Sequence, residues 1–174
     1  MAWGRKPRRA LRSSGRSSDA AEPSHDAGAA RMQALAVMAR RDHGSRELAG
    51  KLAERGFAVD LVATLIEELQ DERLLDDARY VEHFVAAHAR RGQGPMRIRQ
   101  DLRQLKVAEE LVSQALLAGP DWGAVCREVR VRKFSADIPA DWAEKTKQAR
   151  FLQYRGFSSD HIRLALGPDV DADL

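Results

Sequence analysis

The stretch LAERGF at Leu52–Phe57 returns as LQYRGF at Leu152–Phe157, one hundred residues further along the chain. Halfway between them, residues 102–107 read LRQLKV, which keeps the leucine and again ends on an apolar side chain. Recurrence at a fixed spacing without gaps is typical of an array of like units. The positions that define the repeat are Leu52, Gly56, Phe57, Leu102, Val107, Leu152, Gly156 and Phe157. The sequence therefore predicts three tandem copies of one structural unit.

The repeated motif has the composition of a helix end. Leu48 and Leu52 are spaced to lie on one inner face of a helix. Gly56 suits the position just past the helix, where φ is positive and glycine avoids steric strain. Phe57 follows, placed to pack back on that helix. Lys106 stands where the middle copy would need a glycine, and a side chain there costs about 1 kcal/mol. We expect this turn to be either strained or built differently.

The residues after position 30 favour helices over strands. Alanine, leucine, arginine, glutamate and glutamine dominate there, whereas β-branched and aromatic residues are sparse, and this composition favours helix. We expect three helices in each unit and an all-α fold. The expected helices include Arg31–Arg41, one capped by Ser45, one starting near Asp60, one from Asp77, Met96–Leu105, Glu109–Leu117, one from Asp121, and two more between an N-cap at Asp141 and Leu166.

The chain is expected to divide into folded repeats between two tails. The boundaries are a basic tail at 1–30, repeats at 31–76, 77–119 and 120–167, and an acidic tail at 168–174. The first tail is expected to be disordered, because serine, alanine, glycine and arginine leave it little apolar surface to bury. Six cations precede its first acidic residue. The tail either solubilises the chain or contacts phosphates non-specifically.

No pattern for catalysis, cofactor binding or metal binding emerges from the residues. No two histidines have the i, i+4 spacing of a helical metal site, and the nearest pair is His83 and His88. The lone Cys126 excludes an internal disulfide and is expected as a small buried residue. The acidic run from Asp71 to Asp77 is expected to form solvated turns. No apolar run approaches the roughly 18 residues of a membrane span. We expect a protein that is not an enzyme.

Basic residues recur in the second helix of each unit. If the units stack, these helices align into one basic stripe, which fits an acidic protein surface or a nucleic-acid backbone. The alternative is that these basic residues only make the exposed helix faces soluble. The candidate contact residues are Lys51, Arg55, Arg90, Arg91, Arg97, Arg99, Arg103, Lys147, Arg150 and Arg155. The middle repeat is the expected centre, because its charge is densest. No interleaved aromatic residues indicate a platform for stacking bases.

Four motifs in order resemble the RecX family, whose members regulate the RecA recombinase. They are Arg40-Arg41-x-His43-x-Ser45-x-Glu47-Leu48-x-x-Lys51-Leu52-x-x-Arg55-Gly56-Phe57, Leu74-Leu75-Asp76-Asp77-x-Arg79-Tyr80, Arg91-Gly92-x-Gly94-Pro95-x-x-Ile98-Arg99-x-Asp101-Leu102 and Arg150-Phe151-Leu152-x-x-Arg155-Gly156-Phe157-Ser158. The resemblance covers residues 31–167. Each motif is weak alone, and the set in this order is specific. Lys106 and the basic tail depart from the shared pattern.

The resemblance implies an elongated, curved array of three three-helix repeats that modulates RecA without catalysis. Such a protein is expected to bind RecA and its filament on single-stranded DNA, and to suppress assembly, ATP hydrolysis and strand exchange. It is expected to be a cytoplasmic monomer that serves DNA repair, recombination and the SOS response. The protein is also expected to bind nucleic acid directly but without sequence specificity.

Two other functions remain open from the residues. A stand-alone DNA-binding protein would bind DNA without RecA, and its affinity would depend steeply on salt. A helical-repeat adaptor for another partner would leave RecA unaffected, since a fold does not fix a function.

Overall fold

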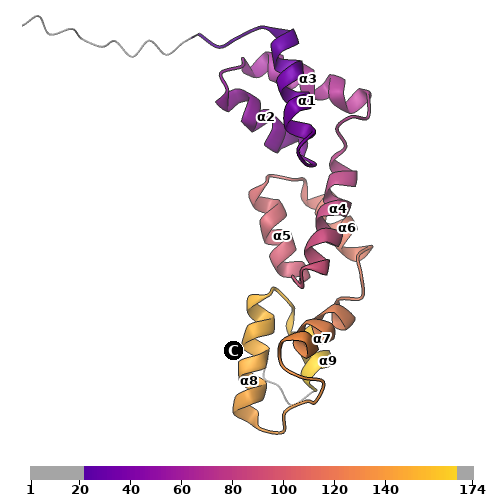
Figure 1. Cartoon of the computed structure of the whole chain (residues 1–174). Helices are drawn as coiled ribbons and strands as arrows, with labels where there is room; N and C mark the ends of the chain where they lie inside the picture. Colours follow the sequence, from indigo (N-terminus) through magenta and orange to yellow (C-terminus); the bar gives the residue numbers. More distant parts are fainter. Residues whose placement is uncertain (1–21, 168–174) are drawn as a thin grey trace, which may run out of the picture.

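The computed structural model describes residues 22–167, and this range contains nine α-helices and one isolated β-bridge (Figure 1). The helices are α1 (Ala27–Met38), α2 (Ser45–Glu54), α3 (Val59–Asp71), α4 (Asp77–Arg90), α5 (Pro95–Gln104), α6 (Glu109–Leu117), α7 (Trp122–Lys133), α8 (Trp142–Tyr154) and α9 (Ser159–Leu166). The prediction of an all-α fold is confirmed. The tail expected at 1–30 lies mostly outside the described residues, and the tail expected at 168–174 lies wholly outside them.

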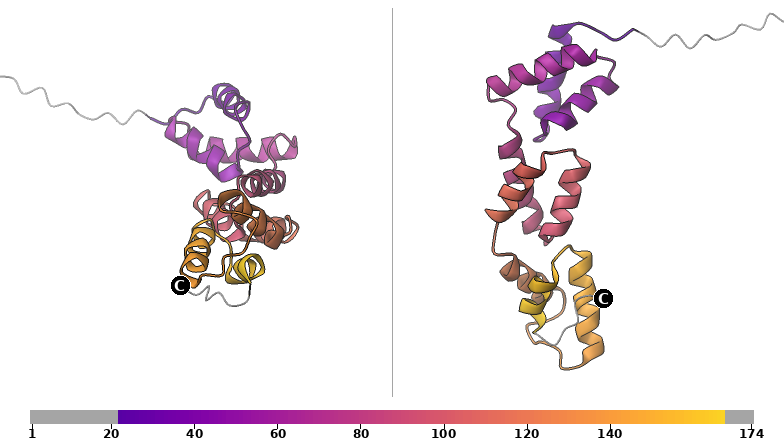
Figure 2. Two further views of the ribbon diagram at one scale, coloured as in Figure 1. Left: turned by 60° about the horizontal axis from the view of Figure 1, so that its bottom comes forward. Right: turned by 180° about the vertical axis from the view of Figure 1, so that it is seen from behind.

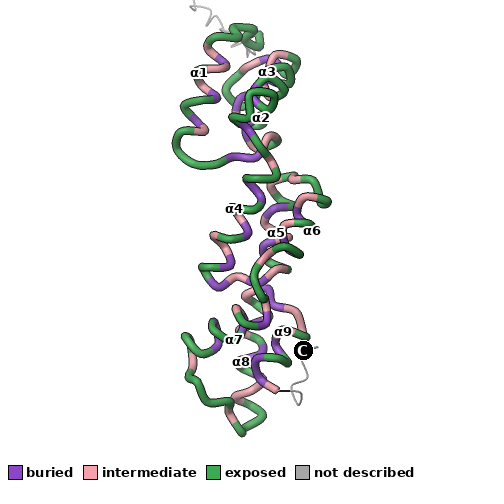
Figure 3. Tube along the Cα trace, turned by 90° about the vertical axis from the view of Figure 1, so that its right-hand side faces the viewer, coloured by how far each residue is buried: buried purple, intermediate pink, exposed green. Residues whose placement is uncertain are grey.

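Helices α1–α3, α4–α6 and α7–α9 form three units that follow one another in an elongated row (Figures 1 and 2). The helices pack mainly within their own unit, and each unit has a separate apolar core. Figure 3 shows buried segments recurring along the inner faces of all three units. Leu52, Leu102 and Leu152 are completely buried at equivalent places in these cores. The stability of such an array is set by each unit and by the contacts between neighbours.

The repeated motif forms the same turn at the end of α2, α5 and α8. After α2, the Phe57 amide donates to the Leu52 carbonyl at 3.3 Å, and the Gly56 amide donates to the Ala53 carbonyl at 2.9 Å. These two bonds satisfy carbonyls that the helix leaves free. The equivalent outer bonds join Val107 to Leu102 at 3.3 Å and Phe157 to Leu152 at 3.2 Å.

Lys106 keeps this turn at the cost of backbone strain. Its φ is 58°, in the left-handed region, while Gly56 and Gly156 have φ of 88° and 90°. Its amide donates to the Arg103 carbonyl at 3.0 Å. The glycine amides in the other two turns likewise donate to the carbonyl three residues earlier. Of the two expectations for Lys106, the strained turn is the one observed.

Two helix starts differ from the sequence prediction. Helix α1 begins at Ala27 rather than Arg31, because the Asp26 carboxylate accepts from the Ala29 amide at 2.9 Å and caps the helix earlier. Ser45 is the first residue of α2 rather than its N-cap, which is Gly44. The hydroxyl of Ser45 is directed elsewhere, since it donates to the Asp77 carboxylate at 2.5 Å.

The junction between the second and third units is closed by backbone contacts. The amides of Gly94 and Met96, at the start of α5, donate to the carbonyls of Arg155 and Gly156 at 2.8 and 3.0 Å. The end of α8 thereby caps the start of α5, and the two helices form one column (Figure 1). Trp122 of α7 adds a second link, because it packs on the core of the second unit.

The junction between the first and second units is built differently. It is held by side chains: the Asp77 carboxylate accepts from the Ser45 amide at 2.7 Å as well as from the hydroxyl, and the His83 ring lies 3.0 Å from the Asp42 carboxylate. A cavity of about 320 Å³ lies between the start of α2 and the turn that contains Lys106. The two junctions therefore differ in kind, although the units they join are copies of one pattern.

Candidate partner-binding surface

Cationic residues gather where the end of α8 meets the start of α5. Arg155 donates from its guanidinium to the Arg91 carbonyl at 3.3 Å, and its charge lies 5.3 Å from the centre of the Phe151 ring. Arg97 adjoins Gly156, since a Cβ on that glycine would lie 2.4 Å from the Arg97 Cβ. The junction between the units therefore brings together three of the predicted contact residues.

The remaining cations of the middle repeat fall into two groups. Arg90 and Arg91 are exposed and form no ion pair with a carboxylate within residues 22–167. Arg97, by contrast, binds Asp101 at 3.2 Å, one turn along α5. Arg90 and Arg91 are better placed to meet an external anion, because no carboxylate must first be displaced, although the Arg91 guanidinium lies 3.5 Å from the His88 ring.

Arg99 and Arg103 are engaged by Glu109 at the start of α6. Arg103 lies 3.4 Å from the Glu109 carboxylate, and Arg99 binds the same carboxylate and the Ser113 hydroxyl. Desolvation alone would raise the pKa of Glu109, but the charges of Arg99 and Arg103 lower it below its ordinary value. These two arginines tie α5 to α6 within the repeat.

The predicted contact residues of the first repeat surround a partly buried polar cluster. Lys51 lies 3.1 Å from Glu47 and 3.1 Å from Nε2 of His43. Burial would raise the pKa of Glu47, but hydrogen bonds from Arg41 and Lys51 hold it below its ordinary value. Arg55 is exposed, and its guanidinium donates to the Lys51 carbonyl at 3.4 Å. Lys51 therefore serves the fold of its own repeat.

The third repeat contributes two further candidates on α8. Lys147 pairs with Glu144 at 3.1 Å. Arg150 is exposed and forms no ion pair among residues 22–167. That these cations act as one continuous stripe stays a prediction, since ion pairs within the chain occupy Lys51, Arg97, Arg99, Arg103 and Lys147.

The one thiol in the described residues, that of Cys126, is buried in the core of the third unit. Burial raises the pKa of the Cys126 thiol to about 12. Within residues 22–167 no group of three or more potential metal ligands occurs. None of the helices in that range is long and apolar enough to cross a membrane.

Sequence reasoning missed the residues that shape the junctions. Gly94 and Gly156 touch so closely that a Cβ on Gly94 would lie 2.3 Å from the Gly156 carbonyl carbon. Both glycines stand within the repeated motifs, and this was the available signal. The hydrogen bond from Ser45 to Asp77 had no signal in the sequence, because 32 residues separate the two partners.

The fold and the cation distribution define a helical-repeat protein with exposed cations beside the junction of its second and third units. Residues 76–116 match the description "RecX, second three-helix domain", and residues 124–166 match "RecX, third three-helix domain". The chain belongs to the RecX family of regulatory proteins, as its curated relatives also show.

Two relatives and one solved structure illustrate the likeness. Regulatory protein RecX of Halorhodospira halophila is 49% identical over 138 residues, which cover 79% of this chain and 86% of that protein. Regulatory protein RecX of Pseudomonas fluorescens Pf-5 is 43% identical over 145 residues, 82% of this chain and 94% of that protein. The crystal structure of RecX from Lactobacillus salivarius shares the fold with a TM-score of 0.72 at 21% identity, covering 80% of this chain and 94% of that one.

Proposed function

We propose that this protein binds the RecA filament on single-stranded DNA and inhibits filament assembly, ATP hydrolysis and strand exchange. The observation that carries the proposal is the row of three like units, with unpaired arginines at and beside the junction of the second and third. A helical filament presents like subunits at regular intervals, and a row of like units can contact several of them at once. Weak contacts at fixed spacing then add through effective concentration.

The contact surface in this proposal is centred on Arg90, Arg91 and Arg155. Arg90 and Arg91 have no carboxylate partner in the described part of the chain, and Arg155 is held by a backbone carbonyl and an aromatic ring. Cations without a local anion can bind an acidic protein surface or phosphates without first breaking an ion pair inside the protein. A protein bound along several subunits blocks the binding of the next subunit, which explains inhibition without a catalytic group.

The test is RecA's ATP hydrolysis on single-stranded DNA, titrated with this protein at amounts well below one per RecA. Inhibition at such amounts is the expected result, because one bound molecule stops the growth of a whole filament. Arg91→Glu is expected to raise the concentration for half inhibition about tenfold, which corresponds to about 1.4 kcal/mol. Arg127→Glu, an exposed reversal on α7, is the matched control and is expected to inhibit like the parent protein.

Three results would contradict the proposed function or its contact surface. Unchanged hydrolysis, together with salt-sensitive DNA binding in the absence of RecA, would indicate a stand-alone DNA-binding protein. Unchanged hydrolysis without DNA binding would indicate an adaptor for a different partner. Equal loss of inhibition in Arg91→Glu and Arg127→Glu would place the contact surface elsewhere.

A further inference from the structure

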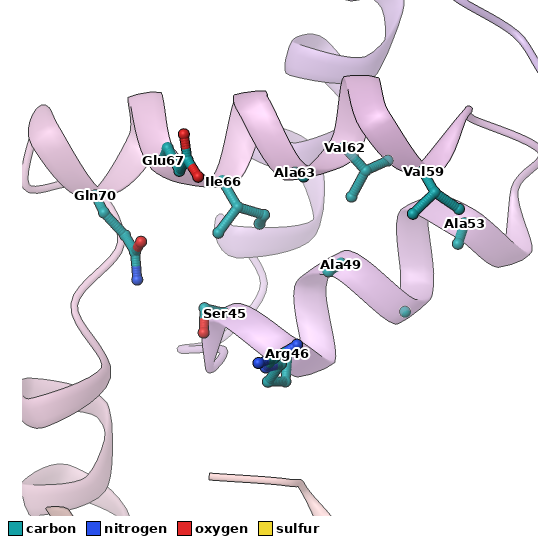
Figure 4. Close-up of a pocket in the computed structure, with 11 residues that line it drawn as sticks. Ser45, Arg46, Ala49, Ala53, Val59, Val62, Ala63, Ile66, Glu67 and Gln70 are labelled. Atoms are coloured by element: carbon teal, nitrogen blue, oxygen red, sulfur yellow. The ribbon is translucent and has the colours of Figure 1, made fainter. Parts of the chain in front are cut away.

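An open apolar groove of about 490 Å³ runs between α2 and α3 of the first repeat (Figure 4). Its floor and walls are small or aliphatic side chains, and its polar groups gather at one end. The lining residues are Ser45, Arg46, Ala49, Gly50, Ala53, Val59, Val62, Ala63, Ile66, Glu67 and Gln70. Val59, at the other end, is 76% exposed. The groove thus holds apolar surface that nothing in the described chain covers.

The second repeat closes the equivalent groove with its own side chains. A shift of fifty residues places Arg99, Arg103 and Glu109 where the first repeat has Ala49, Ala53 and Val59. Arg99 and Arg103 bridge from α5 to Glu109 on α6. The first repeat lacks these bridging side chains, which leaves its groove open.

Gly50 has no internal reason to be a glycine. It lies inside α2, where a glycine costs about 1 kcal/mol relative to alanine. A Cβ at this position would meet nothing within 4 Å. The equivalent positions in the other two repeats are Gln100 and Arg150. Its bare backbone is explained if another segment packs closely against this part of α2.

The N-terminal segment of the chain joins the fold beside this groove. Ser24 pairs in parallel with Phe57, its amide donates to the Gly56 carbonyl at 2.7 Å, and its carbonyl accepts from the Ala58 amide at 2.9 Å. Ala58 directly precedes Val59 at the apolar end of the groove. Because the pairing is parallel, the chain before Ser24 leads back toward the last turn of α2, which also lines the groove.

Residues 1–21 are long enough and have the right chemistry for the groove. Helix α2 has ten residues and is about 15 Å long, and five extended residues span about that distance. Leu11 is an apolar residue flanked by arginines, including Arg9 and Arg12. At the polar end, Glu67 forms no ion pair within residues 22–167, and Asp71 follows one turn later.

We propose that the N-terminal segment docks in the α2–α3 groove, with Leu11 on the small residues of α2 and its neighbouring arginines toward Glu67 and Asp71. The segment is tethered at Ser24, so that a weak contact suffices at the millimolar effective concentration of a short linker.

A spin label on Ser14→Cys of the full chain tests the proposal. Cys126 does not compete for the label, because it is buried and its thiol pKa is raised to about 12. The label is expected to cause a loss of NMR intensity at the amides of Ala49, Ala53 and Ala63. The equivalent amides of the third repeat are expected to keep their intensity.

Two substitutions and one control make the test specific. Gly50→Arg places in the first repeat the side chain that the third repeat carries, and it is expected to abolish the intensity loss while strengthening α2. Leu11→Ser is expected to reduce the loss without touching the folded units. Ala36→Arg, an exposed site on α1 outside the groove, adds the same charge and is expected to change nothing.

Three outcomes would overturn the docking proposal. One is a loss of intensity no greater in the groove than in the third repeat. Another is a loss that persists in both Gly50→Arg and Leu11→Ser. The third is groove amides that stay unaffected by the label but shift when RecA filaments are added, which would assign the groove to a partner. None of these outcomes depends on whether the protein inhibits RecA.

Discussion

Gly156 and Gly56 have the same backbone conformation and very different surroundings. A Cβ on Gly156 would lie 2.4 Å from the Arg97 Cβ and 2.5 Å from the Arg97 amide nitrogen, whereas one on Gly56 would meet nothing within 4 Å. Gly56→Ala is therefore expected to cost about 1 kcal/mol, from backbone strain alone. Gly156→Ala adds overpacking, which typically costs 1–3 kcal/mol more, and it forces the end of α8 away from α5.

Hydrogen exchange at Gly94 and Met96 measures this effect at the junction itself. Both amides are bonded across the junction, so Gly156→Ala is expected to speed their exchange, while Gly56→Ala leaves them protected. Equal exchange in the two variants would show that the junction does not depend on the missing Cβ.

His43 makes the first repeat sensitive to mild acid. Its Nδ1 donates to the Arg41 carbonyl at 2.8 Å, so Nε2 accepts from Lys51 at 3.1 Å. Burial lowers the pKa of His43 and the charges of Arg41 and Lys51 add to this, although the hydrogen bond to the Arg41 carbonyl and the charge of Glu47 oppose it. The unfolded chain therefore takes up a proton first, near the ordinary histidine pKa of about 6.5. Above that pH, His43 does not lower the free energy of unfolding. The free energy of unfolding falls as the pH drops toward the lower pKa of His43 in the folded state.

Urea unfolding at pH 7.5 and pH 5.5 tests this dependence. The parent protein is expected to unfold at lower urea concentration at pH 5.5, and His43→Gln is expected to lose less between the two pH values. A part of the dependence is expected to remain, because burial also lowers the pKa of His161. An identical change in the variant would assign the dependence to other groups.

At the scale of helices, local chemistry predicted most boundaries. Asp141 caps α8 as expected, Pro95 occupies the first turn of α5, and α6 runs from Glu109 to Leu117 as the pattern indicates. The start of α1 was wrong, since Asp26 lies in a stretch whose composition resembles a tail. A cap needs only one polar side chain that accepts from a backbone amide, and composition averages over such a small signal.

Contacts between helices were beyond what one sequence contains. Arg99 and Glu109 are ten residues apart, yet nothing in the sequence says which of the nearby acids an arginine chooses. The list of candidate cations was therefore predictable, while their division into paired and free groups was not. The α2–α3 groove is defined by side chains that are absent, and it appears only when the repeats are compared in space.

At the scale of the whole molecule, the two junctions give the array unequal stiffness. The second junction joins backbone to backbone and carries Trp122 as a further link. The first junction relies on side-chain contacts, from Asp77 to Ser45 and from His83 to Asp42, and contains a cavity of about 320 Å³. Lys106 explains the difference, because its Cβ prevents the close approach that Gly156 allows. A row that bends at one place can adjust its first unit while the other two stay aligned.

Spin-label distances between equivalent positions measure this stiffness directly. Glu54, Gln104 and Tyr154 follow one another at the repeat spacing, and all three are exposed. The distance distribution between labels at 54 and 104 is expected to be broader than that between 104 and 154, since the first junction lacks the backbone bonds of the second. Gly156→Ala is expected to broaden the second distribution toward the first. Equal widths in the parent protein would mean that the side-chain contacts of Asp77 and His83 hold the first junction as firmly as the paired glycines hold the second.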